Sequence, residues 1–346
     1  MANKNLNAAK AAKNDEFYTT YGTVEEELQN YTRHFEGAVV FCNCDDPTMS
    51  NFWRYFHTNF KTLGLRKLIS THFEKDGSPS YKMEYEGGDD LNMEAGAKTP
   101  LKENGDFRSE ECLELLRECT ICCTNPPFSL FRDYMNTLVE NNVKFIIIGT
   151  MNSLHYKEIF PLIRDNKIWT GFSFNKTTEF IMPDDYELKG KAFIDDDGKK
   201  HGFVPGILWY TNLDIEKRHE KFFKPEEVHA YYEGNEGSYP KYYNYNAIEV
   251  GSVDLIPIDY QGEMGVPDSF LERYNPEEFL VVGLGRDGEG ITVNRDIFYT
   301  KIKKMNPNGR PSHIGFFTSD SKAKEPYSRI IIRNRHPVPR SVDEAM

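Results

Sequence analysis

A run of nine residues in the first half of the chain constrains the fold most strongly. Residues 121–129 read ICCTNPPFS, in which four β-favouring residues are followed by an Asn-Pro-Pro-Phe tetrad and a serine. Apolar side chains then recur at helical spacing, at Phe131, Tyr134, Met135, Leu138 and Val139. Ser129 is a natural helix N-cap. The tetrad is therefore predicted at the carboxyl end of a buried strand and directly before a helix, where α/β folds place their chemistry.

The tetrad is suited to holding a flat amine. Pro126 and Pro127 carry no N–H, and each restricts the residue before it, so the backbone is stiff. The Asn125 side-chain amide and the Pro126 carbonyl remain as acceptors, and Phe128 offers a face for a planar ring. These features predict a site that grips the exocyclic amine of a nucleobase. The alternative is a stiff loop with Phe128 in the core, and the strand before and the helix after favour the site.

The composition is that of a globular protein. With 346 residues and a hydrophobic fraction of 39%, the chain should form one large or two medium domains with real cores. No apolar run approaches membrane-spanning length and the start lacks a signal-peptide core, so we expect a soluble, cytoplasmic protein without membrane contact. The six cysteines lack a second CxxC or a histidine at zinc-finger spacing, which favours reduced, buried thiols over a metal site or disulfides.

Charge is distributed unevenly along the chain. The net charge is −12, which taken alone argues against nucleic acid. The C-terminal basic segment, residues 295–340, nevertheless carries eleven Lys or Arg against three Asp or Glu. This segment is a candidate phosphate-binding surface, and a solvated basic tail is the alternative.

Strand and helix signals alternate over the first half of the sequence. After a basic arm at residues 1–14, strands are expected at 38–41, 67–71, 121–124 and 145–148, and helices at 24–34, at 50–60, from Ser109 and at 153–166. Such alternation predicts βαβ units and a parallel sheet. A turn-rich stretch at 78–105 should contain a hairpin around Gly87-Gly88.

Beyond Trp169 the pattern changes to short strands and turns. Strands at 169–174, 180–182, 192–194 and 207–211 should add antiparallel edge strands. From about Leu213 the chain loses its periodicity, which predicts a boundary between one domain over 15–213 and another over 214–346. Within the first, Asp195-Asp196-Asp197-Gly198 hints at calcium, but a hairpin turn is the better interpretation.

Two acidic loops fall at predicted strand ends. Asp45 and Asp46 follow the first predicted strand, where carboxylates could hold the amino group or the ribose hydroxyls of S-adenosylmethionine. Asp106 precedes a predicted helix and can accept from an adenine amine, while Phe107 offers stacking. Each loop alone is typical of an ordinary turn. Their order along a βαβ series, followed by Asn-Pro-Pro-Phe, favours a cofactor site.

These motifs resemble those of the EcoRI-type DNA adenine-N6 methyltransferase family. The matching strings are DEFYT at 15–19, CNCDDP at 42–47, GDFRS at 105–109, TNPPFSLF at 124–131, YPKY at 239–242, IPIDY at 256–260 and MGVP at 264–267. They cover nearly the whole chain. The resemblance implies a class I methyltransferase fold, with a doubly wound, mostly parallel seven-stranded sheet ending in a reversed hairpin and a separate C-terminal target recognition region.

The resemblance also implies a role for each motif. The methionine end of S-adenosylmethionine would be lined by Asp15, Phe17, Tyr18 and Thr19. Asp45 and Asp46 would lie under the cofactor, and Asp106 with Phe107 would meet its adenine. The target base would be held by Asn125, Pro126, Pro127 and Phe128. One departure is the loop at 47–50, PTMS, which stands where most class I methyltransferases have a glycine-rich loop.

The implied activity is methyl transfer from S-adenosylmethionine to the N6 amine of an adenine flipped out of duplex DNA, in a restriction-modification or DNA-protection system. We expect a monomer that contacts double-stranded DNA but no companion endonuclease, and no metal. Phe174 or Phe180 is a candidate for the opposite face of the base, and the tyrosines at 239–245 either touch DNA or form a packing corner. The alternative activity is methylation of a protein amide or an RNA base through the same loop.

Overall fold

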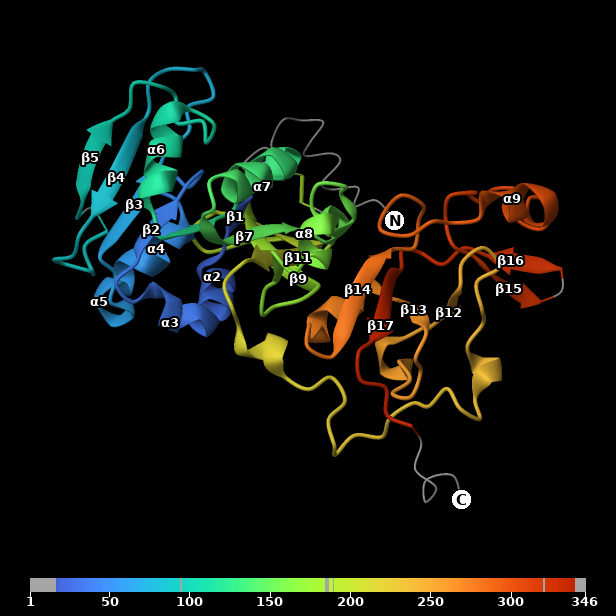
Figure 1. Ribbon diagram of the computed structural model, residues 1–346. Helices are drawn as coiled ribbons and strands as arrows, with labels where there is room; N and C mark the ends of the chain where they lie inside the picture. The colour runs from blue at the N-terminus through green and yellow to red at the C-terminus, as the bar shows by residue number, and fades with distance from the viewer. Residues whose placement is uncertain (1–16, 94, 184–186, 189, 320, 340–346) are drawn as a thin grey trace. The chain divides into compact units, whose positions relative to one another are not determined.

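The computed structural model describes residues 17–93, 95–183, 187–188, 190–319 and 321–339 (Figure 1). Asp15 and the predicted basic arm at 1–14 lie outside the described residues. The chain divides into two compact units: the first runs up to Ile159 and resumes over Ile168–Ile215, and the second comprises Phe160–Lys167 and the chain from Glu216 on. The segment Phe160–Lys167 therefore leaves the first unit and packs with the second.

Four parallel strands form the centre of the first unit's sheet. In spatial order they are β7 (Lys144–Thr150), β6 (Ile121–Thr124), β2 (Val39–Cys42) and β3 (Lys67–Thr71). Every residue of β2 and β6 is buried, which explains why these strands are unbroken apolar runs in the sequence. The bounds of β3 are those predicted, and the others agree within two residues. The predicted parallel βαβ arrangement is confirmed.

Antiparallel strands extend this centre on both sides. Beyond β7 lie β11 (Lys200–Thr211), β9 (Lys176–Met182) and β1 (Tyr18–Thr19), and beyond β3 lie β4 (Tyr81–Tyr85) and β5 (Ala97–Pro100). The strands β8 (Trp169–Thr170) and β10 (Phe193–Ile194) also pair with β11. The expectation of seven strands is therefore wrong, since this sheet has eleven within the described residues. The predicted hairpin around Gly87-Gly88 adds β4 and β5 at one edge, and the N-terminal strand adds β1 at the other.

The helices of the first unit are α2 (Tyr21–Leu28), α3 (Thr32–Phe35), α4 (Asn51–Thr58), α5 (Phe60–Leu63), α6 (Glu110–Glu118) and α7 (Phe131–Glu140). Ser109 accepts a backbone N–H of the first turn of α6, so this predicted cap is confirmed. Ser129 is not a cap, contrary to the prediction. A 3₁₀ turn over Phe128–Leu130 begins at the last residue of the tetrad and precedes α7. In this turn the Leu130 N–H donates to the Pro127 carbonyl at 2.9 Å.

Two predicted helices are broken. The helix expected over 24–34 is interrupted by a 3₁₀ turn at Gln29–Tyr31. The helix expected over 153–166 becomes a 3₁₀ turn at Met151–His155 and a separate helix, α8 (Phe160–Arg164). Proline fits the first turn of a helix but not its interior, so Pro161 prevents one continuous helix there.

A four-stranded sheet organises the second unit. Its order is β12 (Ala247–Glu249), β13 (Glu263–Val266), β17 (Ile330–Asn334) and β14 (Phe279–Leu284), with only the β12–β13 pair parallel. The second unit also contains a separate hairpin, formed by β15 (Phe316–Ser319) and β16 (Lys322–Lys324), and the short helix α9 (Arg295–Ile297).

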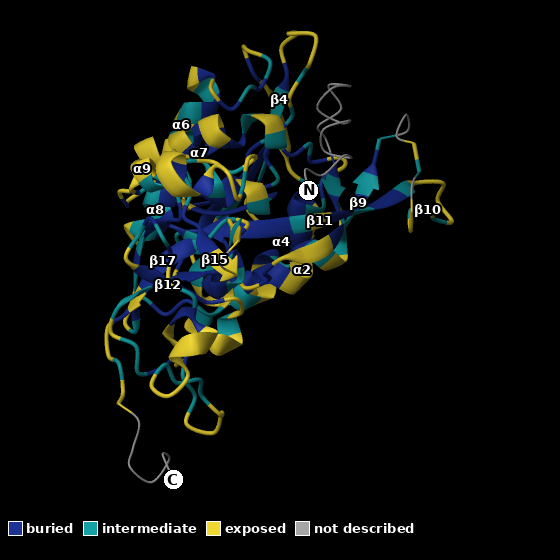
Figure 2. Cartoon of the chain, turned by 90° about the vertical axis from the view of Figure 1, so that its right-hand side faces the viewer, coloured by how far each residue is buried: buried dark blue, intermediate teal, exposed yellow. Residues whose placement is uncertain are grey.

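Burial is concentrated in the strands of both units. Figure 2 shows β11 and β17 largely in dark blue and the outer turns of α2 and α9 in yellow. In the second unit Tyr239 and Tyr242 are buried, and the Tyr242 hydroxyl donates to Glu249, so the packing-corner interpretation is confirmed for these two tyrosines. Within the described residues, no helix is long and apolar enough to cross a membrane.

Candidate active site

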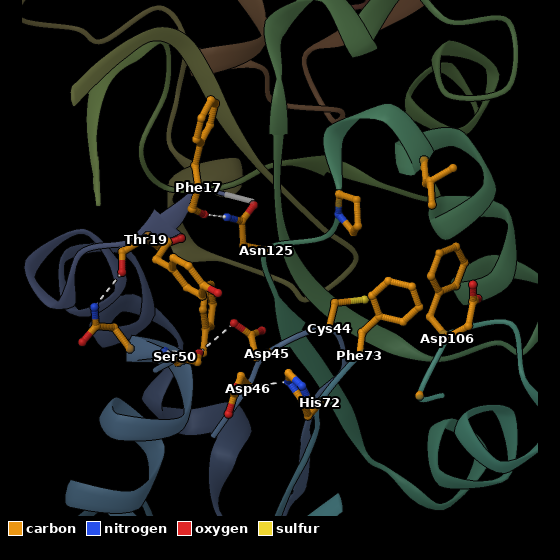
Figure 3. Close-up of a pocket in the computed structure, with 17 residues that line it drawn as sticks. Phe17, Thr19, Cys44, Asp45, Asp46, Ser50, His72, Phe73, Asp106 and Asn125 are labelled. Atoms are coloured by element: carbon orange, nitrogen blue, oxygen red, sulfur yellow. Dashed lines mark hydrogen bonds and ion pairs between the residues drawn. The ribbon is translucent and has the colours of Figure 1, made fainter. Parts of the chain in front are cut away.

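A pocket opens in the first unit where the carboxyl ends of β2, β3 and β6 meet β1 (Figure 3). Part of it is open to solvent. Its lining comprises Phe17, Tyr18, Thr19, Cys44, Asp45, Asp46, Ser50, Asn51, Phe52, His72, Phe73, Gly105, Asp106, Phe107, Asn125, Pro127 and Leu130. Because parallel strands end at one edge of a sheet, loops far apart in the sequence converge here.

Most predicted site residues line this pocket, namely Phe17, Tyr18, Thr19, Asp45, Asp46, Asp106, Phe107, Asn125 and Pro127. Pro126 and Phe128 do not. The half-buried Phe128 ring lies edge-on to the rings of Phe17 and Phe180, with 6.4 Å between the centroids in each pair. Phe180 is fully buried and Phe174 is 7% exposed, so neither presents a free face to a base in this conformation.

The side-chain amide of Asn125 has one end bound and one end unpaired. Its Nδ2 donates to the Phe17 carbonyl at 2.6 Å. Because a carbonyl can only accept, this contact fixes the amide orientation and leaves Oδ1 as the other end. Oδ1 is buried and has no hydrogen-bond partner among the described residues, and the same holds for Thr19 Oγ1. A buried acceptor without a donor is uncommon, and at this position it is available to a ligand that supplies an N–H.

Asp45 lies at the pocket, and two hydroxyl groups contact its carboxylate. The Ser50 hydroxyl donates to it at 2.7 Å, and the Thr124 hydroxyl is in hydrogen-bond contact with it and with the Asn43 carbonyl. Burial raises the pKa of this carboxyl to about 7, although the hydroxyl contacts act in the opposite direction. Asp45 therefore connects the loop after β2 with the start of α4 and the end of β6.

The neighbouring carboxylate, Asp46, has different partners. Its Oδ1 accepts from the backbone N–H and the hydroxyl of Thr48, at 2.9 and 2.8 Å, and from the Tyr81 hydroxyl at 3.0 Å. Its Oδ2 lies 3.1 Å from Nδ1 of His72, whose Nε2 contacts Glu74 at 2.9 Å. The two adjacent carboxylates thus join different parts of the site.

Asp106 is already engaged by a neighbour. Its Oδ1 accepts from Arg108 Nε at 2.9 Å, and its Oδ2 accepts from Arg108 Nη2 at 2.7 Å. These hydrogen bonds lower the pKa of Asp106. The sequence predicts that Asp106 is a lone acceptor for an adenine amine. In the structure its carboxylate already binds Arg108, so an adenine amine would bind it alongside Arg108. The adjacent Phe107 is buried, with its ring edge-on to Tyr134 at 4.9 Å between centroids.

Sequence reasoning missed several lining residues. His72 and Phe73 directly follow β3, and Phe73 is 38% exposed, so an aromatic face borders the pocket. The bounds of β3 are predicted correctly, and the rule that strand carboxyl ends carry the site would have found both residues. Cys44 is different, because its left-handed conformation (φ 77°) has no signal in the sequence.

No group of three His, Cys, Asp or Glu side chains in the described parts of the chain is arranged to hold a metal ion. The Asp195–Gly198 stretch forms the β10–β11 turn, as predicted, with the Asp195 N–H donating to the Lys199 carbonyl at 3.0 Å. All six cysteines are free thiols, of which four are buried.

Comparison with known proteins gives a consistent result. A family described as "Adenine-specific methyltransferase EcoRI" matches residues 5–335. Type II methyltransferase M.EcoRI of Escherichia coli is 44% identical over 319 residues, covering 88% of this chain and 97% of the relative. Type II methyltransferase M.MgeORF184P of Mycoplasma genitalium is 40% identical over 280 residues, covering 80% and 85%. Type II methyltransferase M.MpnI of Mycoplasma pneumoniae is 35% identical over 337 residues, covering 96% and 99%.

No solved structure matches the chain. The family match spans almost the entire sequence, and the M.EcoRI relative aligns over nearly its full length. The resemblance found in the motifs is thereby confirmed. The chain belongs to the EcoRI family of adenine-specific methyltransferases.

Proposed function

We propose that this protein transfers a methyl group from S-adenosylmethionine to the N6 amine of an adenine flipped out of duplex DNA, at a specific site. The observation that carries this proposal is the unpaired, buried Oδ1 of Asn125, held in orientation by the Phe17 carbonyl. An acceptor of this kind matches the N–H of an exocyclic amine. The family assignment and the Type II relatives support DNA as the substrate and a restriction-modification role.

The order of strands supports a class I methyltransferase fold. In the series β3-β2-β6-β7 all neighbours are parallel, and β11 lies antiparallel between β7 and β9. A reversed strand inserted at this end of a parallel sheet is the reversed hairpin that the resemblance implies. The β4–β5 hairpin and β1 are additions at the edges of this arrangement.

The residues that line the pocket support S-adenosylmethionine as the cofactor. Phe17, Tyr18 and Thr19 would hold the methionine end, where the unpaired hydroxyl of Thr19 can bind a polar group. Asp46 would lie under the cofactor, beside Asp45. Its adenine would lie between Asp106 with Phe107 on one side of the pocket and Phe73 on another, and Asp15 would extend the methionine end.

S-adenosylmethionine supplies a sulfonium methyl that is already electrophilic, so this chain needs no covalent nucleophile. Asn125 Oδ1 and the Pro126 carbonyl would accept the two N–H groups of the target amine, orient it and stabilise the positive charge that grows on nitrogen. Pro127 stiffens the loop, and Phe128 would contact the base. Flipping the adenine costs a few kcal/mol, which these contacts must offset.

Residues 214–346 are the proposed target recognition region, and residues 15–213 are the proposed catalytic domain. In the C-terminal basic segment, Arg295, Arg310 and Arg329 pair with carboxylates. Lys301, Lys303 and Lys304 are exposed, and no carboxylate of the described residues lies within 4 Å of them. These three lysines are available for phosphates, which favours DNA over a protein amide as the substrate.

The proposal is tested by offering the protein labelled S-adenosylmethionine together with duplex DNA, RNA or protein. We expect label only in duplex DNA, and digestion to nucleosides should place it in N6-methyl-2′-deoxyadenosine. Sequencing of the methylated DNA would then give the recognition site. Label in RNA or in a protein side chain would contradict the proposal.

A further inference from the structure

Two adjacent carboxylates, Asp45 and Asp46, lie in the loop after β2, directly before the glycine-free stretch PTMS at 47–50. Both line the pocket. The partners of Asp45 indicate what its carboxylate does.

The carboxylate of Asp45 is directed toward the protein rather than toward the pocket. The side chain is only 7% exposed. One oxygen accepts from Ser50, whose hydroxyl also accepts the N–H of Phe52 at 3.0 Å and so begins α4. The other oxygen contacts the hydroxyl of Thr124, the last residue of β6. Both carboxylate oxygens are therefore engaged by groups of the protein itself.

Asn125 is held through its own side chain and through its chain neighbour. Its side-chain Nδ2 donates to the Phe17 carbonyl, and the hydroxyl of Thr124, the residue directly before it, contacts Asp45. Together these contacts determine where the unpaired Oδ1 lies. We propose that Asp45 is a positioning residue, which places the Asn125 amide for methyl transfer by binding the Thr124 hydroxyl. This inference rests on the proposed function.

Thr124→Val tests the connection without touching the pocket. Thr124 is fully buried and does not line the pocket, so its hydroxyl acts only through its partners. Valine keeps the shape of the side chain but removes the hydroxyl, whereas Thr124→Ser keeps it. We expect the single-turnover rate of methyl transfer at saturating cofactor to fall about 10- to 100-fold in Thr124→Val, because a small misplacement of a reacting group has effects of this size. Thr124→Ser should restore most of the rate.

Asp45→Asn distinguishes positioning from cofactor binding. A positioning role predicts a lower single-turnover rate with an unchanged affinity for S-adenosylmethionine, measured by calorimetry. It also predicts that Asp45→Asn has little further effect on the rate when Asn125 is already alanine, because residues that act through one another are not additive.

Glu27→Gln is the matched control: it alters another buried carboxylate, which accepts three hydrogen bonds but lies outside the pocket. It should lower the melting temperature and leave the rate per folded molecule unchanged.

Wild-type rates in folded Thr124→Val and Asp45→Asn would overturn the inference. A weaker cofactor affinity in Asp45→Asn with a normal rate at saturation would also overturn it, and would make Asp45 a cofactor ligand. If Asp45→Asn does not fold, Thr124→Val alone decides. Failure of the wild-type protein to methylate any adenine would overturn the proposed function and this inference together, whereas a normal wild-type rate with unaffected variants would overturn only the inference.

Discussion

At the scale of single residues, Asn125 shows how one amide can be both held and available. Its Nδ2 is bound to the Phe17 carbonyl, and its Oδ1 is buried without a partner in the described residues. An unsatisfied buried acceptor costs about 1–3 kcal/mol. A ligand that donates a hydrogen bond to Oδ1 removes this cost. The proposed substrate amine would therefore gain binding free energy at this atom.

Asp45 predicts a pH dependence of the reaction. The ionised carboxylate is in hydrogen-bond contact with the hydroxyls of Ser50 and Thr124, but the protonated form must donate with one oxygen and so gives up at least one of these contacts as an acceptor. Because its pKa is about 7, we expect the single-turnover rate to fall as the pH drops below about 7. A pH–rate profile measures this, and the inflection should be absent in Asp45→Asn. An identical inflection in that variant would assign the titration to another group.

The charges around Asp45 are consistent with this assignment. Burial raises the pKa values of the neighbouring thiols of Cys42, Cys44 and Cys122, so these stay neutral, and Asp46 is the carboxylate that raises the pKa of Asp45 electrostatically.

The pH dependence that Asp45 gives to the stability of the fold has the opposite sign to the pH dependence of the rate. The folded pKa lies above the ordinary value of 3.8, so the contribution of Asp45 to stability falls as the pH rises from about 4 to about 7. A rate loss at pH 6 therefore cannot be unfolding caused by this group.

The sequence predicts some of these residues and not others, for physical reasons. Asn125 is predictable because a stiff tetrad at a strand end leaves its amide free to accept. The inward direction of Asp45 is not, because its partner Thr124 is 79 residues away in the chain. Adjacent carboxylates look equivalent in a sequence, and only tertiary contacts separate them.

At the scale of secondary-structure elements, α2 is fixed by one buried carboxylate. Glu27 is fully buried and accepts from the Tyr31 hydroxyl at 2.8 Å and from the backbone N–H groups of Phe172 and Ser173 at 2.6 and 2.8 Å. Burial raises the pKa of Glu27. Replacing this side chain leaves three buried donors without an acceptor, which links α2 directly to the loop after β8.

Glu27→Ala should therefore loosen this loop and α2 together. We expect a loss of about 2–4 kcal/mol in local stability, since each buried unsatisfied donor costs about 1–3 kcal/mol and the loop can partly relax. Hydrogen exchange at the Phe172 and Ser173 amides measures the effect, with Glu26→Ala, an exposed neighbour, as the control. Unchanged protection of both amides in Glu27→Ala would show that the carboxylate does not anchor the loop.

Elements are predicted well where local signals agree with tertiary packing. β3 has the predicted bounds because its apolar run is buried on both faces of the sheet. The Ser129 cap fails because the preceding prolines lead into a 3₁₀ turn, which delays α7 to Phe131. The long helix at 153–166 fails because Pro161 can only begin a helix. In both of these cases a proline changes the backbone where the apolar pattern alone predicts a continuous helix.

At the scale of the whole molecule, the distribution of charge matters more than its sum. The chain carries −12 overall, yet eleven of its basic residues lie in the C-terminal basic segment with only three acidic ones. Several arginines of that segment are paired within the second unit. Exposed cations of that segment for which no ion pair is found among the described residues are Lys301, Lys303 and Lys304, together with Lys322, Lys324, Arg333 and Arg335. The three lysines at 301–304 form the most compact group of these in the sequence.

Replacing these three lysines with glutamine should weaken binding to all DNA sequences alike. For each phosphate that no longer binds a lysine, the slope of log affinity against log salt should also become shallower by about 0.9. Fluorescence anisotropy at several salt concentrations measures both effects. Lys144→Gln is a suitable control, because Lys144 is exposed at the start of β7, the end of the strand away from the pocket. An unchanged slope in the triple variant would show that these lysines face solvent in the complex.

The family's architecture can be predicted from motifs at this scale, but the extent of the sheet cannot. The matching strings imply a parallel sheet with a reversed strand, and they do not show that β4, β5 and β1 join it. These edge strands lie in turn-rich or very short segments whose pairing depends on a neighbour, such as Tyr18 opposite Ile181. Edge additions of this kind have weak local signals.

The central claim is that Asn125 receives the target amine, and one measurement tests it most directly. Wild-type protein and Asn125→Ala are compared in single-turnover methylation of duplex DNA at saturating S-adenosylmethionine, with cofactor affinity measured on the same samples. We predict a rate about 10²–10³-fold lower in the variant, the usual cost of one preorganised polar group at a reacting centre, with cofactor affinity retained. A folded Asn125→Ala variant that methylates adenine at the wild-type rate would contradict the account.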